Sequence, residues 1–357
     1  MITIHKPEIK KIDKSVQLQA VIKIGEKEDT LWFEVENKYG EFLTDERADA
    51  FVVGLLWKAL EYGYDIHVLS PMSERLYYTV NTFLIPIISQ IHNYKKINVI
   101  CEQLASKPIS NTGAVGTGLS CGIDSFSTIY EHLKSDKPKN YQITHLTFFN
   151  NGSHGPHGKK KTRSLFEQRI NISRACASDI GKELIIVNSN ISKIVSLNFQ
   201  ATHTLRNMSA VLALQKLFNV YYYSSTYHLK DFKFSTKDSA FYDIFNLSMI
   251  STESVSLFSS CTNLTRVEKT RLVSNFEPAH KYLNVCTRAG SNCGKCNKCL
   301  RTLLTLEIIG ALEKFETVFD LNLYYQNRSK FIKKVKTEHK FDIFLKEIYD
   351  EMVRMSI

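Results

Sequence analysis

Hydrophobic and polar positions change their period at one point of the chain. Small and apolar residues fill positions 113–119, which predicts a buried strand. Over residues 126–133, apolar side chains recur at i, i+3, i+4 and i+7, which predicts one face of an amphipathic helix. Residues 118–125 are therefore predicted to form a tight turn that leads from a strand into a helix.

Predicted strands and helices continue to alternate after this turn. Strands are predicted at residues 144–149, 184–187 and 220–223, and helices at residues 165–180 and 208–218. Regular alternation of this kind favours parallel strands joined by crossover helices. We therefore expect an α/β fold built on a doubly wound parallel sheet.

The residues before this region carry a different pattern. Short β-like runs such as residues 16–24 suggest a small antiparallel sheet, and a helical apolar stripe follows at residues 51–60. We expect these elements to form a unit of their own. The predicted domains are an N-terminal α/β domain at 1–110, a main domain at 111–312 and a basic helical tail at 313–357.

Composition and charge narrow the classes of function. A net charge of +10 favours anionic partners such as nucleotides, nucleic acids or acidic proteins. The lysines are spread along the chain, without an arginine-rich run interleaved with aromatic residues, so nucleic-acid binding is not favoured. The sequence has no apolar run of about 18 residues and no signal-peptide pattern, so we expect a cytoplasmic protein without a membrane partner.

The predicted turn has the chemistry of an anion site. Backbone N–H groups and the positive end of a helix dipole converge at a turn that opens a helix. The hydroxyl groups of Ser120 and Ser125 add two donors. We expect a phosphate-like anion to bind there, and the alternative is a plain strand–helix turn that binds nothing.

Four of the eight cysteines crowd into one short stretch, Cys286, Cys293, Cys296 and Cys299. Four thiolates at these intervals suit tetrahedral Zn²⁺ in a closed, structural site. A reactive thiol cluster and an iron–sulfur centre are the alternatives. The other cysteines are expected to be small core residues, namely Cys101, Cys121, Cys176 and Cys261.

A glycine-rich basic loop at residues 150–161 is a second candidate for ligand contact. Loops that follow parallel strands project from the same edge of the sheet, so this loop should lie near the turn at 118–125. We expect His154 and Lys159 in this loop to contact a charged substrate. The alternative is a mobile, solvated loop.

The six residues at 120–125, Ser-Cys-Gly-Ile-Asp-Ser, resemble the S-G-G-x-D-S loop of the PP-loop ATP pyrophosphatase superfamily, which has a HUP-like fold. Together with the cysteine array, this loop makes the chain similar to the 7-cyano-7-deazaguanine synthase family, the QueC-like proteins. Further segments agree in order along residues 113–302. They are F-N-N-G at 149–152, Arg206-Asn207, L-T-R-V-E at 264–268 and C-L-R at 299–301.

The resemblance implies an ATP-dependent ligase or synthase that forms a C–N bond. It implies adenylation of a small-molecule carboxylate, such as a 7-deazaguanine derivative, with release of pyrophosphate. Amidation by ammonia, nitrile formation or conjugation to a protein amine would follow, in nucleoside modification or in defence against phage. ATP, Mg²⁺ and structural Zn²⁺ are the implied cofactors.

The resemblance also assigns roles to residues. Ser120, Asp124 and Ser125 would be catalytic, with Asp124 holding Mg²⁺ or capping the helix, and Arg206 would also contact the substrate. The implied ATP-binding residues are Leu119, Ser120, Cys121, Gly122, Ile123, Asp124, Ser125, Phe149, Arg206 and Asn207.

The chain departs from the family pattern at three positions. Cys121 replaces a glycine and loses easy access to positive φ, and Asn150 and Asn151 replace an acidic and an aromatic residue. Residues 1–110 have no counterpart in the short bacterial enzyme, and we expect them to contact a partner protein or a second copy of the chain.

Two other functions stay open. A tRNA-thiolating PP-loop enzyme would need a persulfide-forming cysteine, for which Cys121, Cys176 and Cys261 are candidates. A non-catalytic nucleotide-binding module would keep the fold without the reaction.

Overall fold

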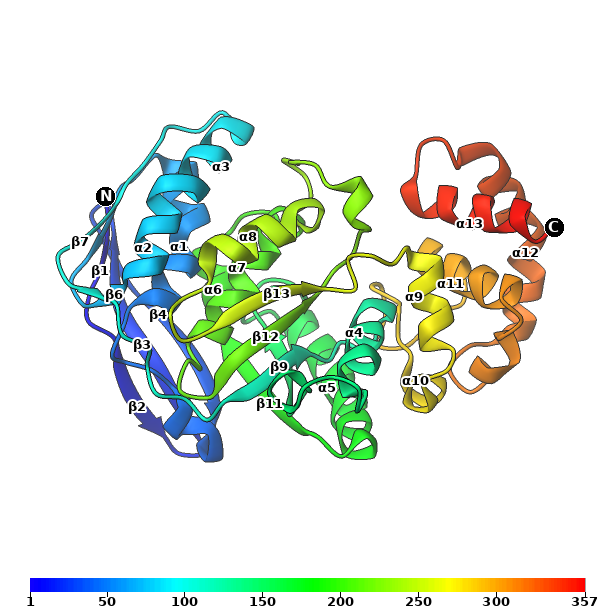
Figure 1. Ribbon diagram of the computed structural model, residues 1–357, viewed down its shortest axis with the longest axis horizontal. Coiled ribbons are helices and arrows are strands. Elements are labelled where there is room, and N and C mark those ends of the chain that lie inside the picture. Colours follow the sequence, from blue (N-terminus) through cyan, green and yellow to red (C-terminus); the bar gives the residue numbers. More distant parts are fainter. Residues whose placement is uncertain (357) are drawn as a thin grey trace.

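One large sheet organises the chain, of which a computed structural model describes residues 1–356 (Figure 1). The sheet has eleven strands, of which β2 (Glu8–Ile12) pairs only with β3. The others, in spatial order, are β13 (Ser256–Ser260), β12 (Phe218–Ser224), β9 (Ala114–Gly118), β10 (His145–Asn150), β11 (Glu183–Ser189), β4 (Lys27–Glu36), β3 (Ser15–Ile24), β1 (Ile2–Ile4), β5 (Ile66–Val68) and β7 (Val99–Cys101). A separate pair joins β6 (Met72–Ser73) to β8 (Leu104–Ala105).

The helices are distributed along the whole chain. The α-helices are α1 (Asp49–Tyr62), α2 (Glu74–Thr79), α3 (Ile85–His92), α4 (Ile123–Leu133), α5 (Lys160–Ile180), α6 (Ile191–Ile194), α7 (Phe199–Leu212), α8 (Asp243–Ile250), α9 (Arg266–Val273), α10 (Glu277–Tyr282), α11 (Asn297–Ile308), α12 (Leu321–Glu338) and α13 (Ile343–Arg354). Shorter helical turns are η1 (Asn37–Phe42), η2 (Val80–Leu84, a π-helix), η3 (Lys139–Tyr141), η4 (Leu229–Asp231), η5 (Ser239–Tyr242) and η6 (Leu312–Phe315).

The strands from β9 onward are parallel, as the sequence predicts. β9 lies between β10 and β12, and β11 and β13 pair in parallel on the outer sides of these two strands. The chain therefore leaves β9 in one direction to build β10 and β11 and then returns to its other side to build β12. The α/β class is confirmed, with a mixed and mostly parallel sheet, whereas the specific PP-loop fold stays a prediction.

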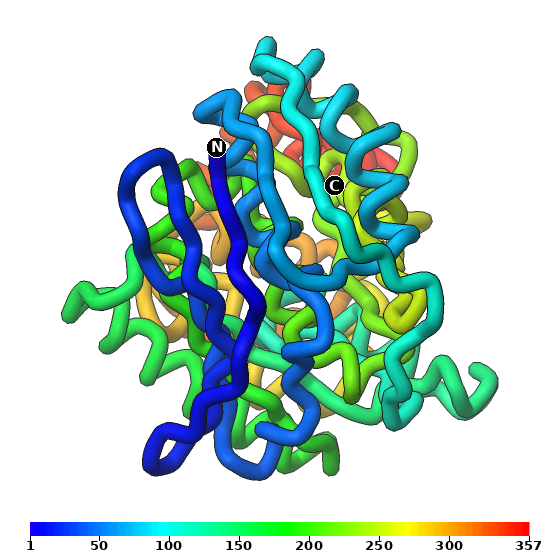
Figure 2. The backbone as a smooth tube through the Cα atoms, turned by 90° about the vertical axis from the view of Figure 1, so that its left-hand side faces the viewer, coloured from blue at the N-terminus to red at the C-terminus, as the bar shows by residue number. Residues whose placement is uncertain are grey.

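The N-terminal strands extend this sheet and do not form a second one. β4 pairs antiparallel with β11, with Phe33 opposite Ser189 and Glu34 opposite Asn188. One hydrophobic core runs across the junction and includes Phe51 and Trp57 of α1 together with Leu205 of α7. Residues 1–110 are thus joined to the rest through a shared sheet and a shared core, and Figure 2 shows these strands lying along one side of the molecule. The domain boundary at 110 stays a prediction.

The C-terminal helices gather at the opposite end of the molecule from the N-terminal strands (Figure 1). α11, α12 and α13 pack around a second core that includes Leu303, Phe331 and Ile348, and this core also contains Phe126 of α4. The residues after 312 are helical, as predicted, and they are packed against the parallel half of the fold. Within residues 1–356, no helix combines the length and the apolar character that crossing a membrane requires.

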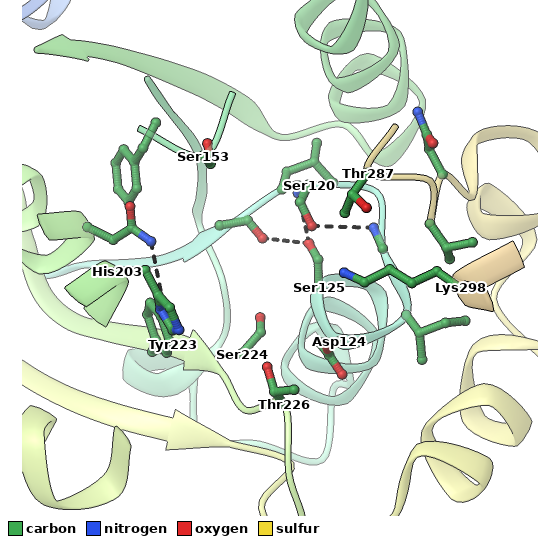
Figure 3. A pocket seen from close by; sticks show the side chains of 18 of the residues that line it. Ser120, Asp124, Ser125, Ser153, His203, Tyr223, Ser224, Thr226, Thr287 and Lys298 are labelled. Carbon is green, nitrogen blue, oxygen red and sulfur yellow. Dashed lines mark hydrogen bonds between the residues drawn. The ribbon is translucent and has the colours of Figure 1, made fainter. Parts of the chain in front are cut away.

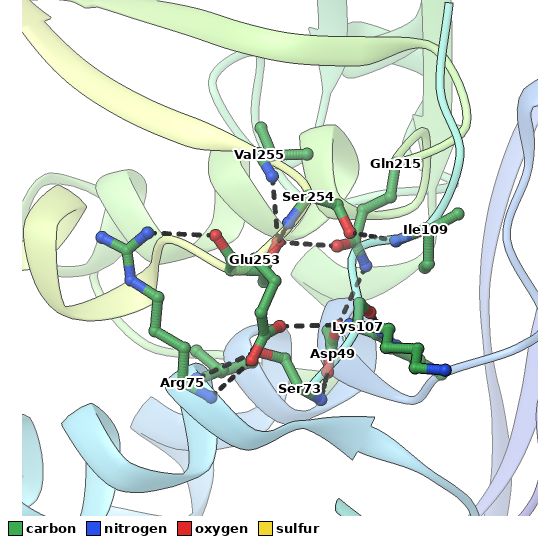
Figure 4. A network of polar contacts seen from close by, with 12 residues as sticks. Asp49, Ser73, Arg75, Lys107, Ile109, Gln215, Glu253, Ser254 and Val255 are labelled. Carbon is green, nitrogen blue, oxygen red and sulfur yellow. Dashed lines mark hydrogen bonds and ion pairs between the residues drawn. The ribbon is translucent and has the colours of Figure 1, made fainter. Parts of the chain in front are cut away.

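A buried polar network joins the N-terminal elements to the loop before β13 (Figure 4). Asp49 of α1 accepts hydrogen bonds from the Ser73 N–H at 2.8 Å and from Gln215 Nε2 at 3.0 Å. Glu253 accepts from the Arg75 N–H at 2.7 Å and pairs with Arg47 at 3.2 Å. Burial raises the pKa of Asp49 to about 6, although the two hydrogen bonds oppose that shift.

Replacing Asp49 should change how stability depends on pH. The pKa of Asp49 is about 4 in the unfolded chain and about 6 in the folded protein, so folding favours the protonated carboxyl. The resulting contribution to the free energy of unfolding is complete below about pH 4 and is lost as the pH rises through about 6. Relative to Asp49→Asn, the wild type should lose about 3 kcal/mol of unfolding free energy between about pH 4 and about pH 7. Urea denaturation at several pH values measures this, with the exposed Asp13→Asn as the control. Parallel pH profiles for wild type and Asp49→Asn would contradict it.

Candidate functional site

A cavity of about 620 Å³ opens at the carboxyl ends of the parallel strands (Figure 3). Its walls include the turn between β9 and α4, the ends of β10 and β12, and residues from α7, α9, α11 and α13. Ligands of open α/β sheets bind where the strand order reverses, and β9 with its neighbours β10 and β12 is that point here. The volume falls within the range of about 300–1,000 Å³ typical of small-molecule sites.

The β9–α4 turn (residues 119–125) is braced by its own serines. Ser125 Oγ donates to the Gly118 carbonyl at 2.6 Å and accepts from the Ser120 N–H at 3.1 Å. Ser120 Oγ accepts from the Gly122 N–H at 3.4 Å. The hydroxyl hydrogen of Ser125 is therefore used inside the turn, which gives this residue a bracing role in place of the predicted donor role.

The start of α4 provides open backbone donors. Gly122 is the N-cap residue, and within residues 1–356 no side chain caps this helix. The predicted alternative of Asp124 as the N-cap is wrong, because Asp124 lies inside the first turn of the helix. Uncapped N–H groups and the helix dipole leave a positive end that faces the cavity lining at Gly122 and Ile123.

Cys121 has a left-handed backbone, with φ of 58°. Its side chain points away from the cavity into the core and lies 3.8 Å from Ser173 Oγ, with about 1% of the residue exposed. A cysteine at positive φ costs about 1–2 kcal/mol relative to glycine. Cys121 stands at the position where the PP-loop pattern that the sequence resembles has a glycine, and its backbone adopts the left-handed conformation that glycine reaches more easily.

Two cationic side chains of α9 hold Asp124. Arg266 Nη2 lies 2.8 Å from Asp124 Oδ2, and Lys269 Nζ lies 3.8 Å from Oδ1. Lys269 is fully buried and donates to the carbonyl and hydroxyl oxygens of Ser225. Burial lowers the pKa of Lys269, while the charge of Asp124 opposes this shift. Asp124 Oδ1 has no hydrogen-bond partner among the described residues.

Further positive charge comes from α11. Lys298 and Arg301 line the cavity, and the Arg301 guanidinium lies 4.1 Å from the ring centre of Phe344 in α13. Arg266 stacks near the same ring at 5.1 Å. Burial and the neighbouring Arg266 lower the pKa of Arg301 to about 10, so this side chain stays charged at neutral pH. The C-terminal helix α13 thus contributes an aromatic surface to the cavity wall.

The four-cysteine cluster lies beside this wall. The sulfur atoms of Cys286, Cys293, Cys296 and Cys299 lie within 4.8 Å of one another and could hold a metal ion. Cys299 Sγ is 3.5 Å from Cys296 Sγ and 3.9 Å from Cys293 Sγ, close to the separation of about 3.8 Å expected for thiolates around Zn²⁺. The donor set therefore fits the predicted zinc site.

The cluster also contacts the turn and the cavity through its neighbours. The Asn284 N–H donates to the Cys121 carbonyl at 2.7 Å. Arg169 of α5 lines the cavity and donates to the Cys286 carbonyl at 2.9 Å. Since α11 begins directly after Cys296, a metal bound there would fix the position of Lys298 and Arg301.

Most of the predicted site residues come together. Those that line the cavity are Leu119, Ser120, Gly122, Ile123, Asp124, Ser125, Phe149, His154 and Asn207. Cys121, Lys159 and Arg206 lie outside the lining. Arg206 is buried, with burial lowering its pKa to about 10, and it donates to the Leu197 carbonyl at 2.8 Å. Lys159 is exposed at the N-terminus of α5.

The basic loop at 150–161 divides its side chains between two directions. His154 faces the cavity and contacts the rings of Phe148 and Phe166, and burial lowers its pKa to about 4. His157 instead packs edge-on against Trp32 of β4. The loop therefore provides one neutral imidazole to the cavity, and the cationic lining comes from other elements.

Several lining residues were not predicted from the sequence. Arg266 and Arg301 lie within the L-T-R-V-E and C-L-R segments, so the resemblance contained the signal for both. Residues without a local signal are His203, Tyr223, Tyr227, Asp238 and Phe344, which the fold collects from three separate parts of the chain.

Comparison of the chain with protein-family models, with curated proteins and with solved structures gives no significant match. A function is therefore inferred from the geometry and chemistry of this cavity.

Substitutions at Cys121 should show the left-handed backbone directly. Cys121→Gly should be more stable than Cys121→Ala by about 1 kcal/mol, because alanine keeps the strain and glycine removes it. Cys176 is equally buried within α5, and there the order should reverse, with Cys176→Ala more stable by about 1 kcal/mol. Thermal or urea unfolding of the four variants measures both differences. The same order at both positions would contradict the assignment.

Loss of one cluster thiol should release the metal. Cys296→Ser should purify without its equivalent of zinc and should aggregate or unfold, since metal binding at such sites is coupled to folding. Elemental analysis and a melting curve measure this, and Cys261→Ser is the control because Cys261 lies outside the cluster. A soluble, metal-free Cys296→Ser protein with the melting temperature of the wild type would exclude a structural metal.

Proposed function

We propose that the cavity binds ATP with its phosphates at the β9–α4 turn and activates a carboxylate by adenylation, with release of pyrophosphate. The main support for this proposal is that the uncapped N-terminus of α4 and several cationic side chains converge on one cavity. The lining contains Arg169, Arg266, Lys298 and Arg301, against only the carboxylates Asp124 and Asp238 among the described residues. Such a site favours a polyanion.

Each group in this part of the cavity has a role in the proposed reaction. The N–H groups at the start of α4 would contact the phosphates, as helix N-termini do in other nucleotide sites. Lys298 and Arg301 would stabilise the charge that develops on the departing pyrophosphate. The Ser120 hydroxyl lies at the open side of the turn and would donate to a phosphate oxygen.

Mg²⁺ and Zn²⁺ fit different places. Mg²⁺ in nucleotide sites is held by one or two carboxylates together with phosphate oxygens. Asp124 lines the cavity, and its Oδ1 has no hydrogen-bond partner in the described residues, with Lys269 Nζ 3.8 Å away, so this carboxylate is the candidate ligand. Bound Mg²⁺ would neutralise phosphate charge. Zn²⁺ in the closed cysteine site would be structural.

Adenylation makes a carboxylate reactive. A free carboxylate has a delocalised charge and a poor leaving group, whereas an acyl-adenylate releases AMP. Ammonia or an amine of a protein can then displace AMP, which gives an amide, a nitrile after a second activation, or a conjugate. The family resemblance of residues 113–302 supports this reaction class and a 7-deazaguanine-like substrate.

The alternative of tRNA thiolation has less support. A persulfide-forming cysteine has to reach the cavity, yet Cys121, Cys176 and Cys261 are all buried and lie outside its lining. The non-catalytic alternative predicts ATP binding without pyrophosphate release, so the same assay decides between it and the proposed function.

Lys298 and Lys295 offer a matched test, because they flank the same cysteines and only Lys298 lines the cavity. Lys298→Met should lower kcat/KM for pyrophosphate release by about 100-fold, the loss typical of one group that stabilises transition-state charge. Lys295→Met should leave the rate unchanged. The assay combines ATP and Mg²⁺ with a panel of carboxylates that includes 7-carboxy-7-deazaguanine. Equal rates for wild type and Lys298→Met would remove this lysine from the mechanism, and no release with any carboxylate would overturn the proposed function.

A further inference from the structure

Three side chains on the cavity wall form a continuous line of polar contacts. His203 of α7 lies at its centre, with Nδ1 2.6 Å from the hydroxyl oxygen of Tyr223 in β12. On its other side, Nε2 lies 3.5 Å from Asp238 Oδ1, in the segment before η5. All three residues line the cavity. Figure 3 shows His203 and Tyr223 on the side of the cavity away from Lys298, with Ser120 and Ser125 between them.

The partners of these groups determine where the protons lie. Asp238 Oδ2 accepts from the Tyr227 hydroxyl at 3.0 Å, and Oδ1 accepts from the Ala240 N–H at 2.9 Å. Asp238 is thus an acceptor, so the imidazole proton is assigned to Nε2 and faces the carboxylate. Nδ1 is then free to accept from the hydroxyl of Tyr223.

The electrostatic surroundings favour this arrangement. Burial opposes ionisation of Asp238, but the contacts with His203 and the Ala240 N–H outweigh burial and lower the pKa of its carboxyl. Burial, together with the nearby carboxyl of Asp243, raises the pKa of Tyr223 well above its usual value, so the phenol is protonated at rest. Asp243 begins α8, is fully buried, and accepts from Thr204 at 2.5 Å.

A second carboxylate, that of Asp243, lies near this line. Asp243 is close enough to His203 and Tyr223 to interact electrostatically with both, so a positive charge on the imidazole would be stabilised by two carboxylates. Asn207 Nδ2 is 3.5 Å from the Tyr223 oxygen and adds a donor there. An imidazole on the cavity wall that contacts a carboxylate through one nitrogen and a phenol hydroxyl through the other is equipped to receive a proton.

We propose that Tyr223 and His203 accept the proton of the amine nucleophile that attacks the acyl-adenylate, with Asp238 as a positioning residue. The inference rests on the proposed function and assigns the second half of that reaction. The amine nitrogen forms a C–N bond to the carbonyl carbon, and the C–O bond to AMP breaks, with its electron pair leaving on the AMP phosphate. The excess proton on nitrogen passes to the Tyr223 oxygen while Tyr223 passes its own proton to His203 Nδ1.

Three assays on the same protein distinguish a role in proton transfer from a role in adenylation. With ATP and 7-carboxy-7-deazaguanine as the probe, exchange of labelled pyrophosphate into ATP reports adenylation alone. Amide formation with ammonium chloride reports attack by a basic amine, which needs a proton acceptor. Hydroxamate formation with hydroxylamine reports attack by a much weaker base, which loses its proton to water.

The variants are His203→Gln, Tyr223→Phe and Asp238→Asn, with His145→Gln as the control because His145 begins β10 at the opposite end of the strand. For His203→Gln and Tyr223→Phe we expect amide formation to fall by about 100-fold, the usual size of a general-base contribution. Exchange and hydroxamate formation should stay within about threefold of the wild type. Asp238→Asn should show a smaller loss, confined to amide formation, and His145→Gln should keep all three rates.

Results that would overturn the proton-acceptor role differ from the result that would overturn the proposed function. Unchanged amide formation in His203→Gln and Tyr223→Phe, or an equal fall of amide and hydroxamate formation, would overturn the proton-acceptor role while leaving adenylation in place. Loss of exchange in both variants would place the line in nucleotide binding and would also overturn it. Absence of exchange in the wild type would instead overturn the proposed function itself.

Discussion

The bend between β9 and α4 is the constraint on which the rest of the structure depends. Its backbone is held from three sides: the Leu119 N–H donates to Thr147 in β10, Ser173 in α5 donates to the Leu119 carbonyl, and the Asn284 N–H donates to the Cys121 carbonyl. These contacts keep a cysteine in a left-handed conformation. Strain that is held in this way at the edge of a cavity is typical of functional sites.

Helices from the second half of the chain place positive side chains beside this bend. Arg266 and Lys269 from α9 reach Asp124, and α11 brings Lys298 and Arg301 after the cysteine cluster. A helix that starts at the cluster and an aromatic ring from α13 hold these cations in place, and a metal bound at the cluster would fix them further. The C-terminal helices therefore belong to the site, although they lie at the far end of the sequence.

Local patterns in the sequence predict those features of the structure that depend on neighbouring residues only. The strand at β9, the helix α4 and the four-cysteine array all have a short-range signal, and the parallel order follows from their alternation. Pairing of β4 with β11 involves only two residue pairs and has no such signal, so the continuous sheet could not be foreseen. The resemblance of the Arg206-Asn207 pair implies a ligand contact for Arg206, but its helix is largely buried, and the guanidinium donates to a backbone carbonyl and lies outside the cavity lining. The line of Tyr223, His203 and Asp238 exists only once three elements have folded together.

Calorimetric titration of the full chain with ATP and Mg²⁺ measures whether the bend holds a triphosphate. We predict that one ATP binds per chain, that inorganic pyrophosphate displaces it and that added salt weakens binding, because the contacts are with phosphate charge. Displacement by adenosine but not by pyrophosphate, or no binding at all, would contradict it.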